Sequence, residues 1–103
     1  MTTFATYPSL NERRVLITGG ASGIGASIVE HFLDQGAHVG FLDFDAAAAE
    51  QLIAGLGARA THCHFVQVDL RDIAGLRHAI DQIQVALDGP VMVLINNAAR
   101  DDR

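Results

Sequence analysis

The most constraining feature of this sequence is a glycine-rich turn between an apolar run and a helical pattern. The run Val15-Leu16-Ile17 precedes three glycines with the spacing G-x-x-x-G-x-G, and the helical pattern begins near Ile24. Gly19 allows a sharp turn, Gly23 lets the backbone approach a ligand closely, and Gly25 lets the helix pack closely on the sheet. Because a helix N-terminus carries unpaired N–H groups and a partial positive charge, the turn predicts a site for a pyrophosphate.

Strand and helix patterns alternate along the rest of the chain. Strands are predicted at residues 14–18, 38–43, 64–69 and 91–95, and helices at residues 24–35, 46–56 and 72–87. This alternation predicts an α/β fold with a doubly wound, Rossmann-like parallel sheet. Right-handed crossovers give the strand order 3-2-1-4, with two helices on one face and the third on the other. The glycine turn and residues 96–99 then meet at the topological switch point, where ligands bind.

The final predicted strand indicates that the sheet is incomplete. The run Val91–Ile95 is apolar throughout, which is typical of an interior strand that is buried on both faces. The sequence stops eight residues after Ile95, and an unpaired apolar edge favours aggregation. We therefore expect an N-terminal arm at residues 1–13, and at residues 14–103 the first part of one domain whose remaining sheet is missing. The alternative is a half-domain that dimerises edge to edge through this strand.

Composition restricts the partners and the compartment. The 103 residues carry a net charge of −5 and no basic cluster, which argues against nucleic acid or an anionic membrane surface as partner. No apolar run approaches the ~20 residues that span a bilayer, and the N-terminus does not resemble a signal peptide. The single Cys63 cannot form an internal disulfide, so we expect a cytoplasmic protein.

A carboxylate at the end of the second predicted strand indicates a dinucleotide. Asp43 falls 18 residues after Gly25, where it can accept both hydroxyls of a ribose. It would repel a 2′-phosphate, and no Lys or Arg lies in residues 19–25 or 44–49 to attract one. The sequence therefore favours NAD over NADP, with Asp43 as a ligand and Asp45 as a helix cap. The alternative is that either aspartate serves only as a cap.

Four features in this order resemble the short-chain dehydrogenase/reductase family: the turn Thr18-Gly19-x-x-x-Gly23-x-Gly25, Asp43, the pair Asp69-Leu70, and Asn96-Asn97-Ala98. The resemblance covers nearly the whole chain from about Leu10 and is closest to the single-domain oxidoreductases. It implies that the cofactor-binding residues are Thr18, Gly19, Ser22, Gly23, Ile24, Gly25, Asp43, Phe44, Asp69, Leu70, Asn97 and Ala98.

The resemblance also implies roles for these residues. Ser22 and Ile24 would contact the pyrophosphate. Asp69 would accept a hydrogen bond from the adenine amino group, and Leu70 would flank the ring. Residues 97–98 would line the adenosine-ribose side, while Asn96 would stabilise the sheet. Ala99 stands where the family usually has glycine, a small departure from the pattern.

The catalytic residues of the family are not expected in this chain. The family uses a Tyr as general acid/base, assisted by Lys, Ser and Asn, for hydride transfer between a carbon atom and the nicotinamide. Its Tyr-x-x-x-Lys belongs downstream of the fourth strand, whereas the only tyrosine here is Tyr7 and no lysine occurs. The intact enzyme would be an NAD-dependent dehydrogenase that forms a dimer or tetramer, with an alcohol as substrate.

The last eight residues, 96–103, are similar to a branch that oxidises sugars at the anomeric carbon, such as bacterial galactose or arabinose dehydrogenases. An aldose is therefore a candidate substrate, and a charged, solvated loop is the alternative interpretation. Two further hypotheses remain open: a non-catalytic dinucleotide-binding or regulatory module, and a fragment that cannot fold alone.

The segment His62-Cys63-His64 suggests a metal site. In an extended segment the two histidines share one face and Cys63 points away, and no further ligand is evident. The sequence therefore predicts no metal site, surface histidines and a buried Cys63. His31, His38 and His78 are scattered, and we expect them to be exposed.

Overall fold

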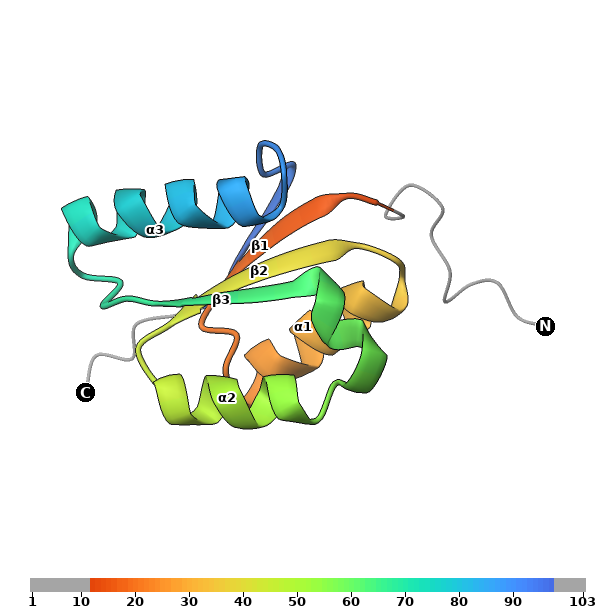
Figure 1. The fold of residues 1–103 in the computed structure, drawn as a ribbon. Helices are drawn as coiled ribbons and strands as arrows, with labels where there is room; N and C mark the ends of the chain where they lie inside the picture. Colours follow the sequence, from red (N-terminus) through yellow and green to blue (C-terminus); the bar gives the residue numbers. More distant parts are fainter. Residues whose placement is uncertain (1–11, 98–103) are drawn as a thin grey trace.

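The computed structural model describes residues 12–97, which form a four-stranded parallel sheet with helices on both faces (Figure 1). The strand order β3-β2-β1-β4 confirms the predicted order 3-2-1-4. The elements are β1 (Arg14–Thr18), α1 (Gly23–Asp34), β2 (His38–Asp43), α2 (Ala46–Ala54), the 3₁₀ helix η2 (Gly57–His62), β3 (Cys63–Gln67), α3 (Ile73–Ala86) and β4 (Val93–Asn96).

The apolar core lies in two layers because successive strand residues point to opposite faces of the sheet. Helices α1 and α2 cover one face and α3 covers the other, as the topology predicted (Figure 1). Val15 and Phe41 are buried on the α1 and α2 side, whereas Leu16 and Leu42 are buried on the α3 side. The arrangement places the carboxyl ends of all four strands at one edge of the sheet.

Side chains and glycines set the ends of the helices. Asp45 caps α2 as predicted, because its Oδ1 accepts a hydrogen bond from the Ala48 N–H at 3.0 Å. Gly36, with φ of 88°, follows α1 in the left-handed conformation that glycine favours. The predicted end of α2 at Leu56 is wrong, since the α-helix ends at Ala54 and the chain continues into η2.

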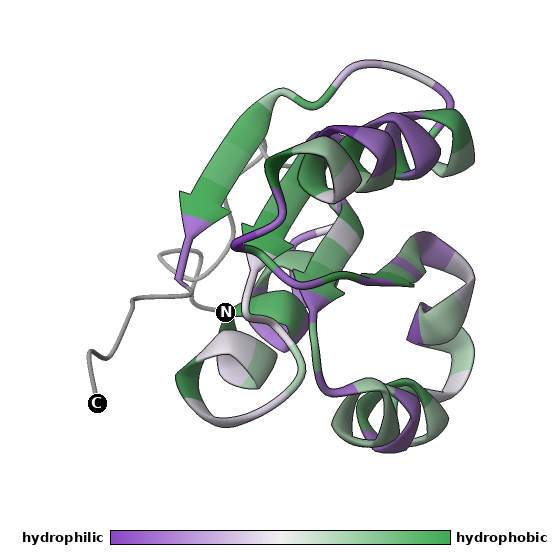
Figure 2. Ribbon diagram, turned by 90° about the vertical axis from the view of Figure 1, so that its left-hand side faces the viewer, coloured by the Kyte–Doolittle hydropathy of each residue, from purple (hydrophilic) through white to green (hydrophobic). Residues whose placement is uncertain are grey.

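Strand β4 differs from its prediction. It spans Val93–Asn96 rather than residues 91–95, and the expectation of burial on both faces is wrong for the described residues. Val93 and Ile95 pack against the α1-side core, but Leu94, which faces the other side, is 61% exposed. The physical reason is that α3 packs on β2 and β3 and leaves the β4 end of that face open. Figure 2 shows β4 as an apolar edge that ends in a hydrophilic tip.

Within residues 12–97, no helix combines the length and the apolar character needed to cross a membrane.

Candidate functional site

The glycine turn after β1 has the conformation that its sequence predicts. Gly19 and Gly23 have φ of 71° and 60°, in the left-handed region that glycine adopts without steric cost. A Cβ at Gly23 would meet no atom within 4 Å, so the space in front of it is open, whereas a Cβ at Gly25 would overlap the carbonyl oxygen of Gly19. Helix α1 therefore starts in direct contact with the turn, which requires glycine at position 25.

The start of α1 offers backbone donors to a ligand. Ser22 is the N-cap residue, but its side chain makes no capping hydrogen bond, and residues 22–24 are exposed. The first N–H groups of a helix have no partner within the helix and attract anions. The open space in front of Gly23, the Ser22 hydroxyl that makes no capping hydrogen bond, and the N–H groups of the first helical turn together fit a phosphate group of a dinucleotide.

Asp43 fixes the turn from the β2 side. Its Oδ2 accepts a hydrogen bond from the Ala21 N–H at 3.0 Å, and its Oδ1 accepts one from the Asp45 N–H at 2.9 Å. The Gly19 N–H also donates to the Leu42 carbonyl oxygen at 2.7 Å. Since each carboxylate oxygen has two lone pairs, Asp43 keeps acceptor capacity for a ribose. Asp43 thus does more than cap a helix, and its role as a ribose ligand stays a prediction.

Two asparagines fix the turn from the β4 side. The Thr18 hydroxyl donates to Oδ1 of Asn96 at 2.8 Å, which joins the ends of β1 and β4. Nδ2 of Asn97 donates to the Gly19 carbonyl oxygen at 3.0 Å. Asn96 therefore has the structural role that the family resemblance implied, and Asn97 positions the turn itself. Ala98 lies outside the described residues.

The predicted adenine contact, Asp69, is paired with a residue that the sequence reasoning missed. Arg71 donates from Nε and Nη2 to Oδ1 and Oδ2 of Asp69 at 3.1 and 3.0 Å, and its own N–H donates to Oδ1 at 3.0 Å. These hydrogen bonds lower the pKa of Asp69 to about 2. The opposite charges two residues apart in Asp69-Leu70-Arg71 were the available signal. Arg71 therefore favours the ionised form of Asp69, whose oxygens act only as hydrogen-bond acceptors.

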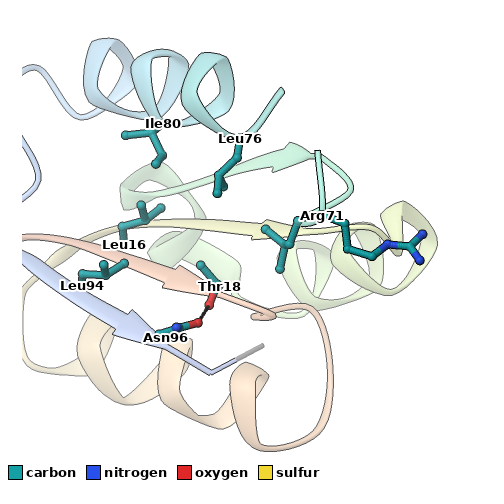
Figure 3. Close-up of a pocket in the computed structure, with 8 residues that line it drawn as sticks. Leu16, Thr18, Arg71, Leu76, Ile80, Leu94 and Asn96 are labelled. Atoms are coloured by element: carbon teal, nitrogen blue, oxygen red, sulfur yellow. Dashed lines mark hydrogen bonds between the residues drawn. The ribbon is translucent and has the colours of Figure 1, made fainter. Parts of the chain in front are cut away.

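An apolar hollow of about 320 Å³ lies on the α3 side of the sheet, between α3 and the strands β1 and β4 (Figure 3). Leu76 and Ile80 point from α3 toward Leu16 and Leu94, while the guanidinium of Arg71 points away from them (Figure 3). The remaining lining residues are Thr18, Leu70 and Asn96. With so few polar groups the hollow suits apolar side chains rather than a phosphate, so the glycine turn remains the better dinucleotide site.

The structure thus brings most of the predicted residues to one edge of the sheet. Asp43, Asn97 and the turn at residues 18–25 are in direct contact through hydrogen bonds, and Asp69 follows the end of the outer strand β3. Phe44 follows β2 and is 68% exposed beside this edge. In the part of the chain that the structure describes, no group of three or more His, Cys, Asp or Glu side chains is arranged to hold a metal ion.

Comparisons with known proteins agree on one family. A family model described as "short chain dehydrogenase" matches residues 13–103. The chain is 49% identical over 98 residues to the "Probable galactose dehydrogenase GalD" of Rhizobium meliloti, a match covering 94% of this chain and 38% of that protein. It is 40% identical over 99 residues to the D-xylose 1-dehydrogenase of Caulobacter vibrioides, covering 96% and 38%. The chain therefore spans well under half the length of these relatives.

Solved structures share the fold. A short chain dehydrogenase from Bacillus anthracis superposes with a TM-score of 0.79 at 30% identity, over 87% of this chain and 36% of that one. A 3-ketoacyl-(acyl-carrier-protein) reductase from Brucella melitensis, complexed with NADH, superposes with a TM-score of 0.73 at 28% identity, over 82% and 33%. The fold of this chain thus has counterparts in solved proteins of this class.

Proposed function

Because the chain belongs to the short chain dehydrogenase family, we propose that it supplies the NAD-binding part of an enzyme that oxidises an aldose at its anomeric carbon. The observation that carries the cofactor assignment is the Asp43 carboxylate, which the Ala21 N–H holds against the glycine turn. An acidic group at this place accepts ribose hydroxyls and repels a 2′-phosphate. The proposal therefore specifies NAD rather than NADP.

The residues of this chain bind and orient the cofactor. N–H groups at residues 22–25 bind the pyrophosphate, Asp43 binds the adenosine ribose, and Asp69 accepts a hydrogen bond from the adenine amino group. Bound NAD supplies the acceptor for the hydride that leaves the substrate carbon. The sequence holds no lysine and one tyrosine, Tyr7, so the groups that move the substrate proton belong to the rest of the enzyme.

The substrate class rests on similarity. A galactose dehydrogenase and a D-xylose 1-dehydrogenase are the relatives at 49% and 40% identity, and both names specify sugars. We propose an aldose with a free anomeric hydroxyl, whose oxidation gives a lactone. The intact enzyme would work in the cytoplasm, which suits the free Cys63 thiol, and would form a dimer or tetramer.

Steady-state kinetics of the intact protein tests both parts of the proposal. D-galactose, D-xylose and L-arabinose are offered with NAD or NADP, and formation of the reduced cofactor is followed by absorbance. We expect a kcat/KM for NAD at least about tenfold above that for NADP, which corresponds to about 1.4 kcal/mol. Oxidation of simple alcohols in preference to every sugar would refute the substrate class. Binding of NAD without any turnover would favour the non-catalytic module.

A pair of variants isolates the role of Asp43. Asp43→Ser combined with Phe44→Arg removes the repelling carboxylate and adds a cation at an exposed position, so the preference for NAD should weaken or reverse. Asp45→Ser is the matched control, because it removes a carboxylate two residues away while serine preserves the helix cap. An unchanged preference in the double variant, with the fold checked by circular dichroism, would contradict the assignment.

A further inference from the structure

Two histidines meet at the end of the sheet opposite the glycine turn. His38 is the first residue of β2, and His62 immediately precedes β3. The parallel pairing of Val39 with Cys63 brings the two side chains together, with their Nδ1 atoms 3.1 Å apart. The expectation that His38 is exposed is therefore wrong, since its side chain is 27% exposed and contacts His62.

The carboxylate of Glu12 contacts Nε2 of His38, the ring nitrogen that does not contact His62. Oε1 of Glu12 lies 3.1 Å from Nε2 of His38. As a neutral ring, His38 donates its Nε2–H to this carboxylate, and its Nδ1 then carries a lone pair directed toward His62. A carboxylate behind a histidine is the arrangement that orients metal-binding imidazoles and raises their basicity.

We propose that the His38–His62 pair binds a divalent late transition-metal ion of the Ni²⁺, Cu²⁺ or Zn²⁺ class through its two Nδ1 atoms. Imidazole nitrogen is a preferred ligand for these ions. With metal–nitrogen distances of about 2.0–2.1 Å, two nitrogens 3.1 Å apart subtend an angle of about 100° at the ion. This angle lies between those of square-planar and tetrahedral sites, so one ion can bridge the rings with little movement.

The disposition of the rings and their exposure support a shared ion. The ring centroids are 4.4 Å apart with planes inclined at 84°, and the two Nδ1 atoms are within hydrogen-bond distance, so an ion that bridges them takes the place of this N–H···N contact. His62 is exposed and His38 is partly exposed, so water can complete the coordination. His64 lies near enough for the charges of both rings to act on it, although the described residues form no three-ligand set. The site is thus a two-histidine site of modest affinity.

Copper binding by the intact, tag-free protein tests the proposal, with Cu²⁺ alone as the probe. Calorimetry of the wild type should show one saturable ion per chain, and electron paramagnetic resonance should show hyperfine coupling to two nitrogens. His62→Gln and His38→Gln should each weaken binding at least about a hundredfold. His78→Gln, which changes an exposed histidine on α3, is the matched control and should bind as the wild type does.

Glu12→Gln tests the carboxylate separately, because it leaves both imidazoles in place. We expect Cu²⁺ binding that is about 10- to 100-fold weaker but retains the two-nitrogen signal. The wild-type spectrum decides the question even where a variant fails to fold: coupling to a single nitrogen, or no binding at about millimolar Cu²⁺, overturns the proposal. Equal binding by folded His62→Gln and wild type overturns it as well. None of these readouts depends on NAD.

Discussion

Replacing Gly25 with alanine adds a methyl group where α1 meets the glycine turn. The new Cβ would overlap the Gly19 carbonyl oxygen and would lie 2.8 Å from Nδ2 of Asn97. The carbonyl belongs to the backbone, and Asn97 is hydrogen-bonded to it, so neither atom can move away without changing the turn. The substitution should therefore displace the start of α1 from the end of β1.

The expected cost follows from three contributions. Overpacking of a tight contact costs about 1–3 kcal/mol, and loss of the Asn97–Gly19 hydrogen bond costs about 0.5–1.5 kcal/mol. The higher helix propensity of alanine offsets up to about 1 kcal/mol. We therefore expect the free energy of unfolding to fall by about 1–3 kcal/mol. NAD binding should weaken as well, because the displaced N–H groups are those that face the pyrophosphate.

Chemical denaturation and NAD titration of the intact protein measure the two effects. Gly55→Ala is the matched control, because Gly55 has φ of −85° and a Cβ there would make only ordinary contacts, the nearest at 3.6 Å. That control should be neutral or should stabilise the protein by about 0.4–1 kcal/mol. If Gly25→Ala is as stable as Gly55→Ala and binds NAD like the wild type, the close approach at Gly25 is not what requires glycine there.

Three further outcomes are expected. The pKa of Asp69, followed by NMR, should be about 2 in the wild type and should move toward 3.8 in Arg71→Gln. The ionised Asp69 stabilises the fold fully above pH 3.8, and this stabilisation is lost as the pH falls through 2. Equal acid stability of the variant and the wild type would therefore contradict the pairing of Asp69 with Arg71. Burial raises the pKa of the Cys63 thiol to about 12, so alkylation at pH 8 should be slow until the protein is unfolded, and rapid native reaction would show an accessible thiol. Gly40→Ala should destabilise by about 1–3 kcal/mol because its Cβ overlaps Ile83. The double variant Gly40→Ala with Ile83→Ala should lose less stability than the sum of the two separate losses, because the smaller side chain leaves room for the Cβ. Simple additivity of the two losses in denaturation would exclude this contact.

Local patterns predicted the elements well because they depend on neighbouring residues. Strands β1 and β2 have the predicted bounds, 14–18 and 38–43, and the Asp45 cap is found where an aspartate precedes a helical run. The strand order also followed from sequence, since right-handed crossovers leave few arrangements for alternating strands and helices. The positions of the glycine turn, Asp43 and residues 96–97 at one edge are a consequence of that order.

Apart from the Asp69–Arg71 pair and the end of α2, the misses concern contacts between segments far apart in the chain. The bonds from Asp43 to the Ala21 N–H and from Asn97 to Gly19 depend on side-chain directions at adjacent strand ends, which no local pattern contains. The meeting of His38 and His62 depends on the register between β2 and β3. Uniform apolarity of β4 indicated two buried faces, but burial depends on what covers the strand, and α3 leaves Leu94 open.

Asp43 links cofactor preference to the shape of the turn. Its two oxygens each accept one backbone hydrogen bond, from Ala21 and from Asp45, so the carboxylate that would bind the ribose also holds the turn in place. A side chain without an acceptor would leave the part-buried Ala21 N–H unpaired, at a cost of about 1–3 kcal/mol. Cofactor preference can therefore change without loss of the turn only where the replacement side chain still accepts a hydrogen bond from the Ala21 N–H. An effect of Asp43→Ala on NAD binding would mix loss of the ribose contact with loss of the turn.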